Sequence, residues 1–163
     1  MILLRLSLLW LIGSVAMAHA AGSSPTTLPS PIGRWVTQNQ KAVVRIHPCG
    51  TDGLCGEIVG LAVGQTDKLP LDWQGKPQCG ETMLETKPQT DSGTGATTWV
   101  GRVLDPRNGQ VYHATIGMDD NGDLRLHGYV GLPIFGQTQT WTRYRGRTPP
   151  NCRILAGTLG SGQ

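Results

Sequence analysis

The sequence lacks the motifs that mark several common classes of enzyme. After the first 20 residues it contains only five serines, and none lies in the Gly-x-Ser-x-Gly turn that presents a nucleophile. Neither a phosphate-cradling loop nor a dinucleotide-binding fingerprint occurs. Its aspartates and glutamates lie mostly in expected turns, where solvation or local capping explains them. No catalytic residue, metal ligand or cofactor is therefore predicted.

The chain also lacks any segment, after the first 20 residues, that keeps an apolar stripe at helical spacing for three turns. It has instead short segments with a two-residue period, broken by proline and by Asn-Gly pairs. Glycine, at 23 of 163 residues, has about twice its usual share. This pattern is typical of short antiparallel strands joined by tight turns. We predict an all-β domain.

The chain has little excess of positive over negative charge. Its net charge is only +3, and this value falls by one if Arg5 is removed with a signal peptide. Such a weak excess predicts no nucleic-acid partner. Four arginines do gather near the C-terminus, at positions 143, 145, 147 and 153. We interpret this cluster as belonging to a solvated end of the chain, with a C-terminal tail over residues 146–163.

Residues 1–20 are typical of a secretory signal peptide, which would direct the protein to the periplasm or out of the cell. Arg5 is followed by the apolar run Leu8–Ala18, and small residues flank His19. We predict cleavage after Ala20, with Ala18 as the alternative last residue removed. A membrane-spanning helix is the competing interpretation, but the apolar run is shorter than the roughly 20 residues that a span needs. No transmembrane span is expected after cleavage.

Residues 21–31 are small, polar and proline-rich, which predicts a flexible leader. The folded domain is expected over residues 32–145, beginning with the strand Gly33–Thr37. The stretch Leu126–Tyr144 reads as the closing pair of strands, because its residues alternate on either side of a break containing glycine and proline. We predict a small antiparallel up-and-down β-barrel, closed by pairing of Gly33–Thr37 with Gln137–Tyr144.

The four cysteines of an exported chain are expected to form disulfides. Pairing of Cys49 with Cys55 is favoured because the loop between them is short and ends in strands. Cys79 and Cys152 are then left as the second pair by elimination. The alternative is a metal site in which His47 joins the cysteine ligands.

Five aromatic residues are the candidate contacts for a ligand: Trp35, Trp99, Tyr112, Phe135 and Trp141. Inward aromatic side chains in a small barrel can either fill the core or line a cavity for one apolar molecule. Side chains can just fill the interior of an eight-stranded barrel. A filled core and a ligand pocket therefore both stay open.

Several motifs, in order along the chain, resemble the bacterial exported family called domain of unknown function 2147. They are Gly33-Arg34-Trp35, KAVVRIHPCG from Lys41, LCGEIVGL from Leu54, WVGRVLDPRNGQVYHA from Trp99 and HGYVGLPIFGQTQTWTRY from His127. The family name assigns no activity.

A more distant similarity is to lipocalins and other calycins, which begin with Gly-x-Trp on the first strand and carry an arginine near the end of the last. The matching residues are Trp35 and Arg143. The resemblance implies a lipocalin-like barrel in which the guanidinium of Arg143 packs over the indole of Trp35 and closes one end.

The leading prediction is a non-enzymatic barrel that binds a small apolar ligand or an envelope component. A structural or protein-interaction module, with an envelope protein as its partner, is the alternative. A hydrolase-type enzyme that uses aspartate or histidine residues is the third interpretation.

Overall fold

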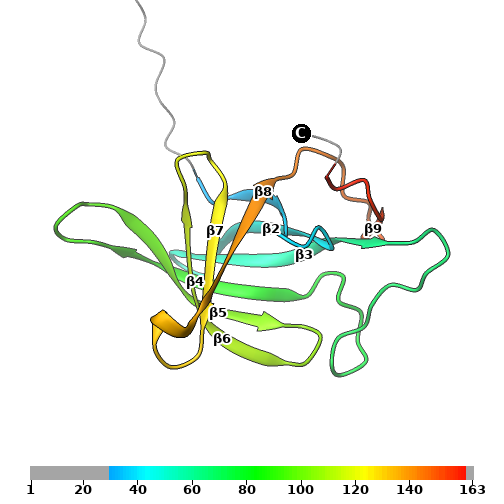
Figure 1. Ribbon diagram of the computed structural model, residues 1–163, viewed down its shortest axis with the longest axis horizontal. Coiled ribbons are helices and arrows are strands. Elements are labelled where there is room, and N and C mark those ends of the chain that lie inside the picture. The colour runs from blue at the N-terminus through cyan, green and yellow to red at the C-terminus, as the bar shows by residue number, and fades with distance from the viewer. Residues whose placement is uncertain (1–29, 161–163) are drawn as a thin grey trace, which may run out of the picture.

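The computed structural model describes residues 30–160 (Figure 1). The predicted signal peptide and all of the predicted leader except residues 30 and 31 lie outside this range. Among the described residues, no helix is long and apolar enough to cross a membrane. The elements in chain order are β1 (Gly33–Val36), β2 (Ala42–Cys49), β3 (Gly53–Val63), β4 (Thr82–Thr90), β5 (Thr97–Asp105), β6 (Gln110–Met118), β7 (Leu124–Tyr129), the 3-10 helix η1 (Pro133–Phe135), β8 (Gln137–Arg143) and β9 (Arg153–Leu155).

Strands β1 to β8 form a closed antiparallel up-and-down barrel, as predicted. Each strand pairs with its neighbours in the sequence, and β1 also pairs with β8. In this last pairing Trp35 lies opposite Arg143 and Val36 lies opposite Thr142. The first and last strands of the barrel therefore meet, which leaves no open edge between them.

The strand connections divide between the two ends of the barrel. The β1–β2, β3–β4, β5–β6 and β7–β8 connections gather at one end, which we call the open end. The other three connections lie at the opposite end, which we call the closed end.

Two tight turns use the predicted Asn-Gly pairs: Gly109 (φ +75°) follows β5, and Gly122 (φ +79°) follows β6. Both glycines adopt the left-handed backbone that side chains disfavour.

The main core fills the barrel with apolar side chains from alternate positions of the strands. On β6, Ala114 and Ile116 are fully buried, with Tyr112 and Met118 partly buried against the same cluster. These residues alternate along the strand, as the two-residue period of a strand requires. The buried members of the cluster are Trp35, Val44, Ile46, Leu54, Leu84, Val103, Ala114, Ile116, Leu124, Leu126 and Trp141.

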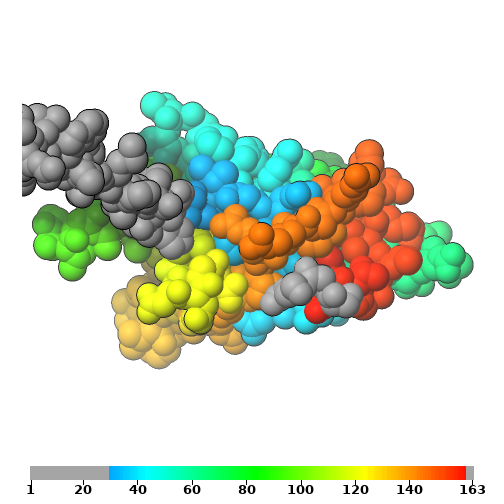
Figure 2. All heavy atoms as spheres, turned by 90° about the horizontal axis from the view of Figure 1, so that it is seen from above, coloured from blue at the N-terminus to red at the C-terminus, as the bar shows by residue number. Residues whose placement is uncertain are grey.

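A second, smaller core lies outside the barrel, under residues 144–160. A register shift between Val43 and Val44 allows both valines to be buried, Val44 in the main core and Val43 in this outer cluster. Ile154 and Leu159 cover Val43 from the C-terminal segment. In Figure 2 the orange and red C-terminal residues lie against the blue residues of the N-terminal strands.

The interpretation of residues 146–163 as a solvated tail does not hold for Cys152, Ile154 and Leu159, which are buried, whereas residues 145–147 and 155–158 are exposed. Residues 153–155 form β9, which pairs in parallel with the end of β3, from Leu61 opposite Arg153 to Val63 opposite Leu155. The reason is that this short segment carries apolar residues, Ile154 and Leu159, that are buried against the barrel.

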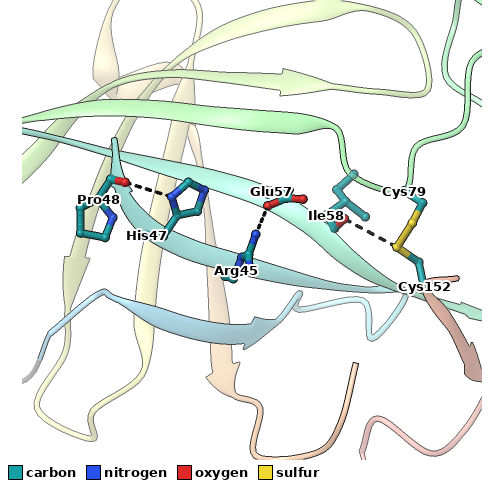
Figure 3. A network of polar contacts seen from close by, with 7 residues as sticks. All are labelled: Arg45, His47, Pro48, Glu57, Ile58, Cys79 and Cys152. Atoms are coloured by element: carbon teal, nitrogen blue, oxygen red, sulfur yellow. Dashed lines mark hydrogen bonds and ion pairs between the residues drawn. A yellow bond between two sulfur atoms is a disulfide. The ribbon is translucent and has the colours of Figure 1, made fainter. Parts of the chain in front are cut away.

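Both predicted disulfides are present, Cys49–Cys55 at the closed end and Cys79–Cys152 at the open end. A cysteine in a disulfide has no thiolate to offer a metal, so the alternative in which Cys49 and His47 are ligands does not hold. Figure 3 shows the Cys79–Cys152 bond beside Ile58 of β3, with an ion pair between Arg45 and Glu57 on β2 and β3. The second disulfide ties the β3–β4 connection to the start of β9.

Candidate ligand-binding cavity

The open end of the barrel contains a cavity of about 760 Å³. This volume lies within the range of small-molecule sites, about 300–1,000 Å³. Strands on all sides of the barrel contribute to its wall. The apolar part of the wall includes Ile58, Leu61, Met83, Val103, Leu126 and Trp141.

Small residues on the strands keep this end hollow. Ala42 of β2 and Gly128 of β7 both line the cavity. A Cβ atom on Gly128 would find its nearest neighbours 3.8 Å away at Val103 and 3.9 Å away at the carbonyl of His113. These are ordinary van der Waals distances, so the position has room for a side chain that the sequence does not supply.

Polar residues of the cavity come mainly from the connections and strand ends of the open end: Thr37, Asn39, Lys41, Gln78, Asp105, Arg107, Gln137 and Gln139. Several are already hydrogen-bonded to the protein. The buried Gln78 donates from Nε2 to the carbonyl of Leu71 (2.9 Å), and Trp141 donates from Nε1 to Oε1 of Gln139 (2.9 Å). The cavity therefore offers an apolar wall and a polar rim, which suits a molecule with an apolar body and a polar end.

Asp105 and Arg107 form an ion pair on this rim. Arg107 donates from Nε and Nη2 to the two carboxylate oxygens at 2.9 and 2.7 Å, and its backbone N–H donates at 3.0 Å. The hydrogen bonds from the Arg107 side chain lower the pKa of Asp105 below its usual value, although partial burial opposes them. This carboxylate is therefore held ionised and fixes the β5–β6 turn.

Glu81 is the carboxylate with the opposite shift. Burial raises its pKa, and Asp72 raises it further, while Lys76 lowers it. Its Oε2 is buried with no hydrogen-bond partner among the described residues. Glu81 lies two residues after Cys79 and does not line the cavity. Sequence reasoning did not single it out, because nothing in the sequence separates it from the other carboxylates of that region.

The five predicted ligand contacts fall into two groups. Tyr112, Phe135 and Trp141 line the cavity. Trp35 is fully buried at the closed end and Trp99 packs against the main core, and neither lines the cavity. Phe135 comes from the β7–β8 connection and is 74% exposed, so it reaches the cavity from its rim.

The aliphatic residues of the cavity wall are not among the predicted ligand contacts. Leu126 lies in a stretch with a two-residue period, which is the pattern of a strand with one inward face. Such a pattern identifies the inward face but does not show which inward residues border empty space.

Arg143 fastens the closed end. Its Cζ lies 3.9 Å from the centroid of the Trp35 ring, and its guanidinium donates to the carbonyls of Ile32 (2.8 Å) and Ser30 (2.9 Å). Trp35 in turn donates from Nε1 to the carbonyl of Pro31 (2.7 Å). Residues 30 and 31, predicted as the end of the flexible leader, are thus held against the barrel.

Gly33 makes this arrangement sterically accessible. Its φ of +141° lies in the region that side chains rarely adopt. A Cβ there would collide with Nη1 of Arg143. Burial lowers the pKa of Arg143, and Arg145 contributes in the same direction. The Gly-x-Trp motif therefore has a physical reason: the glycine provides the space through which the guanidinium reaches the indole.

Comparison with known proteins gives a family and a structural likeness. The chain is similar to the solved structure of protein HP1028 from Helicobacter pylori, which is described as belonging to the lipocalin family. The two sequences are 17% identical, the match covers 71% of this chain and 83% of that chain, and the TM-score is 0.49. No curated protein matches the sequence significantly. The family model of the uncharacterised proteins conserved in bacteria, DUF2147, matches residues 33–143, which run from the start of β1 to the end of β8. The chain therefore belongs to the DUF2147 family.

Proposed function

We propose that this protein is a non-enzymatic binding protein that holds a small, largely apolar ligand in the open end of its barrel. The observation that carries the proposal is the cavity of about 760 Å³ with an apolar wall. Removal of apolar surface from water supplies about 25 cal/mol per Å² to such binding. The filled closed end sets how deep a ligand enters.

The polar rim defines the other part of the ligand. Polar atoms that enter an apolar cavity without a hydrogen-bond partner lose free energy. A ligand that places its apolar body against Leu126 and Trp141 and its polar end near Lys41 or Arg107 avoids this cost. We therefore favour an amphiphilic molecule or envelope component over a pure hydrocarbon.

The proposed compartment is the periplasm or the outside of the cell. Two disulfides support this proposal, because such bonds persist in oxidising compartments. The predicted signal peptide, with cleavage after Ala20, agrees with it.

A neutral fluorescent dye, N-phenylnaphthylamine, tests the proposal with the substitution Gly128→Leu. The leucine side chain would occupy the cavity, so dye affinity should fall at least about tenfold. The free energy of unfolding should change by no more than about 1 kcal/mol, because glycine is a poor strand residue and its neighbours leave room.

Gly117→Leu is the matched control. Gly117 also lies within a strand, β6, but a Cβ there meets no atom within 4 Å, and the residue does not line the cavity. This variant should bind the dye as the wild type does. Folded wild-type protein that fails to bind the dye, or equal loss of binding in both variants, would contradict the proposed function.

A further inference from the structure

The β7–β8 connection carries a cluster of exposed apolar side chains, which we call the apolar loop (residues 130–136). The exposed fractions are 59% for Val130, 61% for Leu132, 81% for Ile134 and 74% for Phe135. In Figure 1 this loop is the gold turn that projects from the barrel at the lower left. Grouped apolar residues in water usually mark a surface that contacts something apolar.

The apolar loop has a defined conformation. Its 3-10 turn is closed by hydrogen bonds from the N–H of Phe135 to the carbonyl of Leu132 (3.1 Å) and from the N–H of Gly136 to the carbonyl of Pro133 (2.9 Å). His127 of β7 donates from Nε2 to the same Pro133 carbonyl (2.9 Å). A Cβ on Gly136 would lie 2.6 Å from the His127 ring, so the turn packs directly on it.

This backbone suits an environment poor in water. Unpaired N–H and C=O groups are costly inside or against lipid. Pro133 has no N–H, the N–H groups of Phe135 and Gly136 are bonded within the turn, and the Pro133 carbonyl accepts two hydrogen bonds. The turn therefore presents apolar side chains while the N–H groups of Phe135 and Gly136 and the carbonyl of Pro133 are hydrogen-bonded within the protein.

The location and charge of the loop point to a membrane. Val130 and Phe135 line the cavity, so the loop is continuous with the mouth of the barrel. The sequence contains no aspartate or glutamate after Asp123. On the rim, the Asp105 carboxylate is paired with Arg107, and Lys41 adds a positive charge. Anionic lipid headgroups would thus meet no unpaired carboxylate from the loop or from its flanking strands.

We propose that the apolar loop docks the protein on a lipid bilayer, with Leu132, Ile134 and Phe135 entering the boundary between headgroups and acyl chains. Shallow insertion of this kind needs only a few apolar side chains next to a polar surface. A stable protein–protein interface buries about 800 Å² on each partner, which is far more than one short turn supplies. Docking turns the cavity mouth toward the membrane and does not require the cavity to be occupied.

Flotation of the full mature protein with vesicles of phosphatidylethanolamine and phosphatidylglycerol tests the proposal. The substitution Ile134→Asp should lower the partition coefficient by about tenfold or more, because it replaces the most exposed apolar side chain of the loop with a charge. The matched control is Leu155→Asp, which adds the same charge at a half-exposed leucine of β9. It should change partitioning by no more than about twofold.

Three results would overturn the docking proposal. In the first, the wild-type protein does not float with the vesicles. In the second, Ile134→Asp and Leu155→Asp lose vesicle binding equally. In the third, the protein self-associates in sedimentation experiments and Ile134→Asp makes it monomeric without changing flotation, which would assign the loop to contact between copies. Gly128→Leu should float normally, so loss of dye binding and loss of docking are distinguishable.

Discussion

The two ends of the barrel are built from the same eight strands, yet one is filled and the other is hollow. At the closed end the inward positions hold large side chains, such as Trp35, Ile46 and Leu124, all essentially without exposed surface. At the open end Ala42 and Gly128 occupy cavity-lining positions. Alternation along the strands decides which residues face inward. The size of those residues decides whether the interior is a core or a pocket.

The ends also differ in how they are fastened. At the closed end a single arginine spans Trp35 and the residues that precede β1. At the open end β3 stops pairing with β4 after Glu57, and from Leu61 onward it pairs with β9 instead. The disulfide Cys79–Cys152 connects the two sides of this seam. The disulfide of the open end thus joins segments far apart in the sequence, whereas that of the closed end, Cys49–Cys55, closes only the short β2–β3 turn, and Arg143 holds the start and end of the barrel together there.

Removal of the disulfides should give the largest effect and should separate the two ends. In the chain-entropy model the pair Cys79–Cys152, 73 residues apart, contributes about 4 kcal/mol, and Cys49–Cys55, six residues apart, contributes about 2 kcal/mol. The free energy of unfolding measured in urea should therefore fall more in the double alanine variant of Cys79 and Cys152 than in that of Cys49 and Cys55. Only loss of Cys79–Cys152 should also weaken dye binding, because only that pair lies at the open end. Equal destabilisation by both variants would contradict this account.

Substitution of Arg143 tests the closed end. Arg143→Met should lower the free energy of unfolding by about 2 kcal/mol, from two hydrogen bonds and the cation–π contact with Trp35. Arg143→Lys should lose part of this, since an ammonium cannot stack as a plane.

Arg125→Met is the control for Arg143, because Arg125 is exposed and, within residues 30–160, its side chain donates only to the hydroxyl of Thr140. It should change stability by no more than about 0.5 kcal/mol. Urea midpoints for Arg143→Met that fall within the same margin would mean that the arginine does not fasten this end.

The smallest effect is expected at Asp105 on the open rim. The pKa of Asp105 is lower in the folded protein than its usual value of 3.8, so its contribution to stability is present at neutral pH and is lost as pH falls through the folded pKa. Arg107 is exposed, so solvent screening limits this contribution to about 1 kcal/mol or less. Asp105→Asn should be slightly less stable than the wild type at about pH 7, and this difference should be smaller at about pH 3. A constant difference in midpoint between these two pH values would exclude the ion pair as the cause.

The strands, their hairpin turns and the Cys49–Cys55 disulfide could be predicted because they depend on local patterns: alternating residues, Asn-Gly turns and the close spacing of two cysteines. The Cys79–Cys152 pair followed only by elimination, and closure of the barrel followed from the up-and-down order of the strands together with the lipocalin resemblance. The sequence does not show the extent of β4, which spans Thr82–Thr90. Residues 87–90 pair only with β5 and are exposed, so they carry no apolar alternation. A strand outside the core leaves no periodic signal.

The packed C-terminal segment and the cavity could not be predicted for a related reason. Ile154 and Leu159 are too few and too widely spaced to form a pattern, and their burial depends on a valine, Val43, that is far away in the sequence. The hollow end depends on the small inward residues Ala42 and Gly128 and on connections whose course is not periodic. Phe135 illustrates this, since its residue type suggested a core position and the turn that carries it places it at the rim.

Closure of the barrel through Arg143 also constrains the order of folding. The hydrogen bond from Arg143 to Ser30 joins residues 113 positions apart, whereas the hairpins β5–β6 and β6–β7 join neighbours along the chain. Contacts between distant residues form more slowly than local ones, because more chain entropy is lost before they are made. The hairpins can therefore form while the chain is incomplete, but the closed end must wait for the last strand of the barrel. A chain truncated before β8 would leave β1 without its second neighbour, and this edge would be exposed to association with other chains.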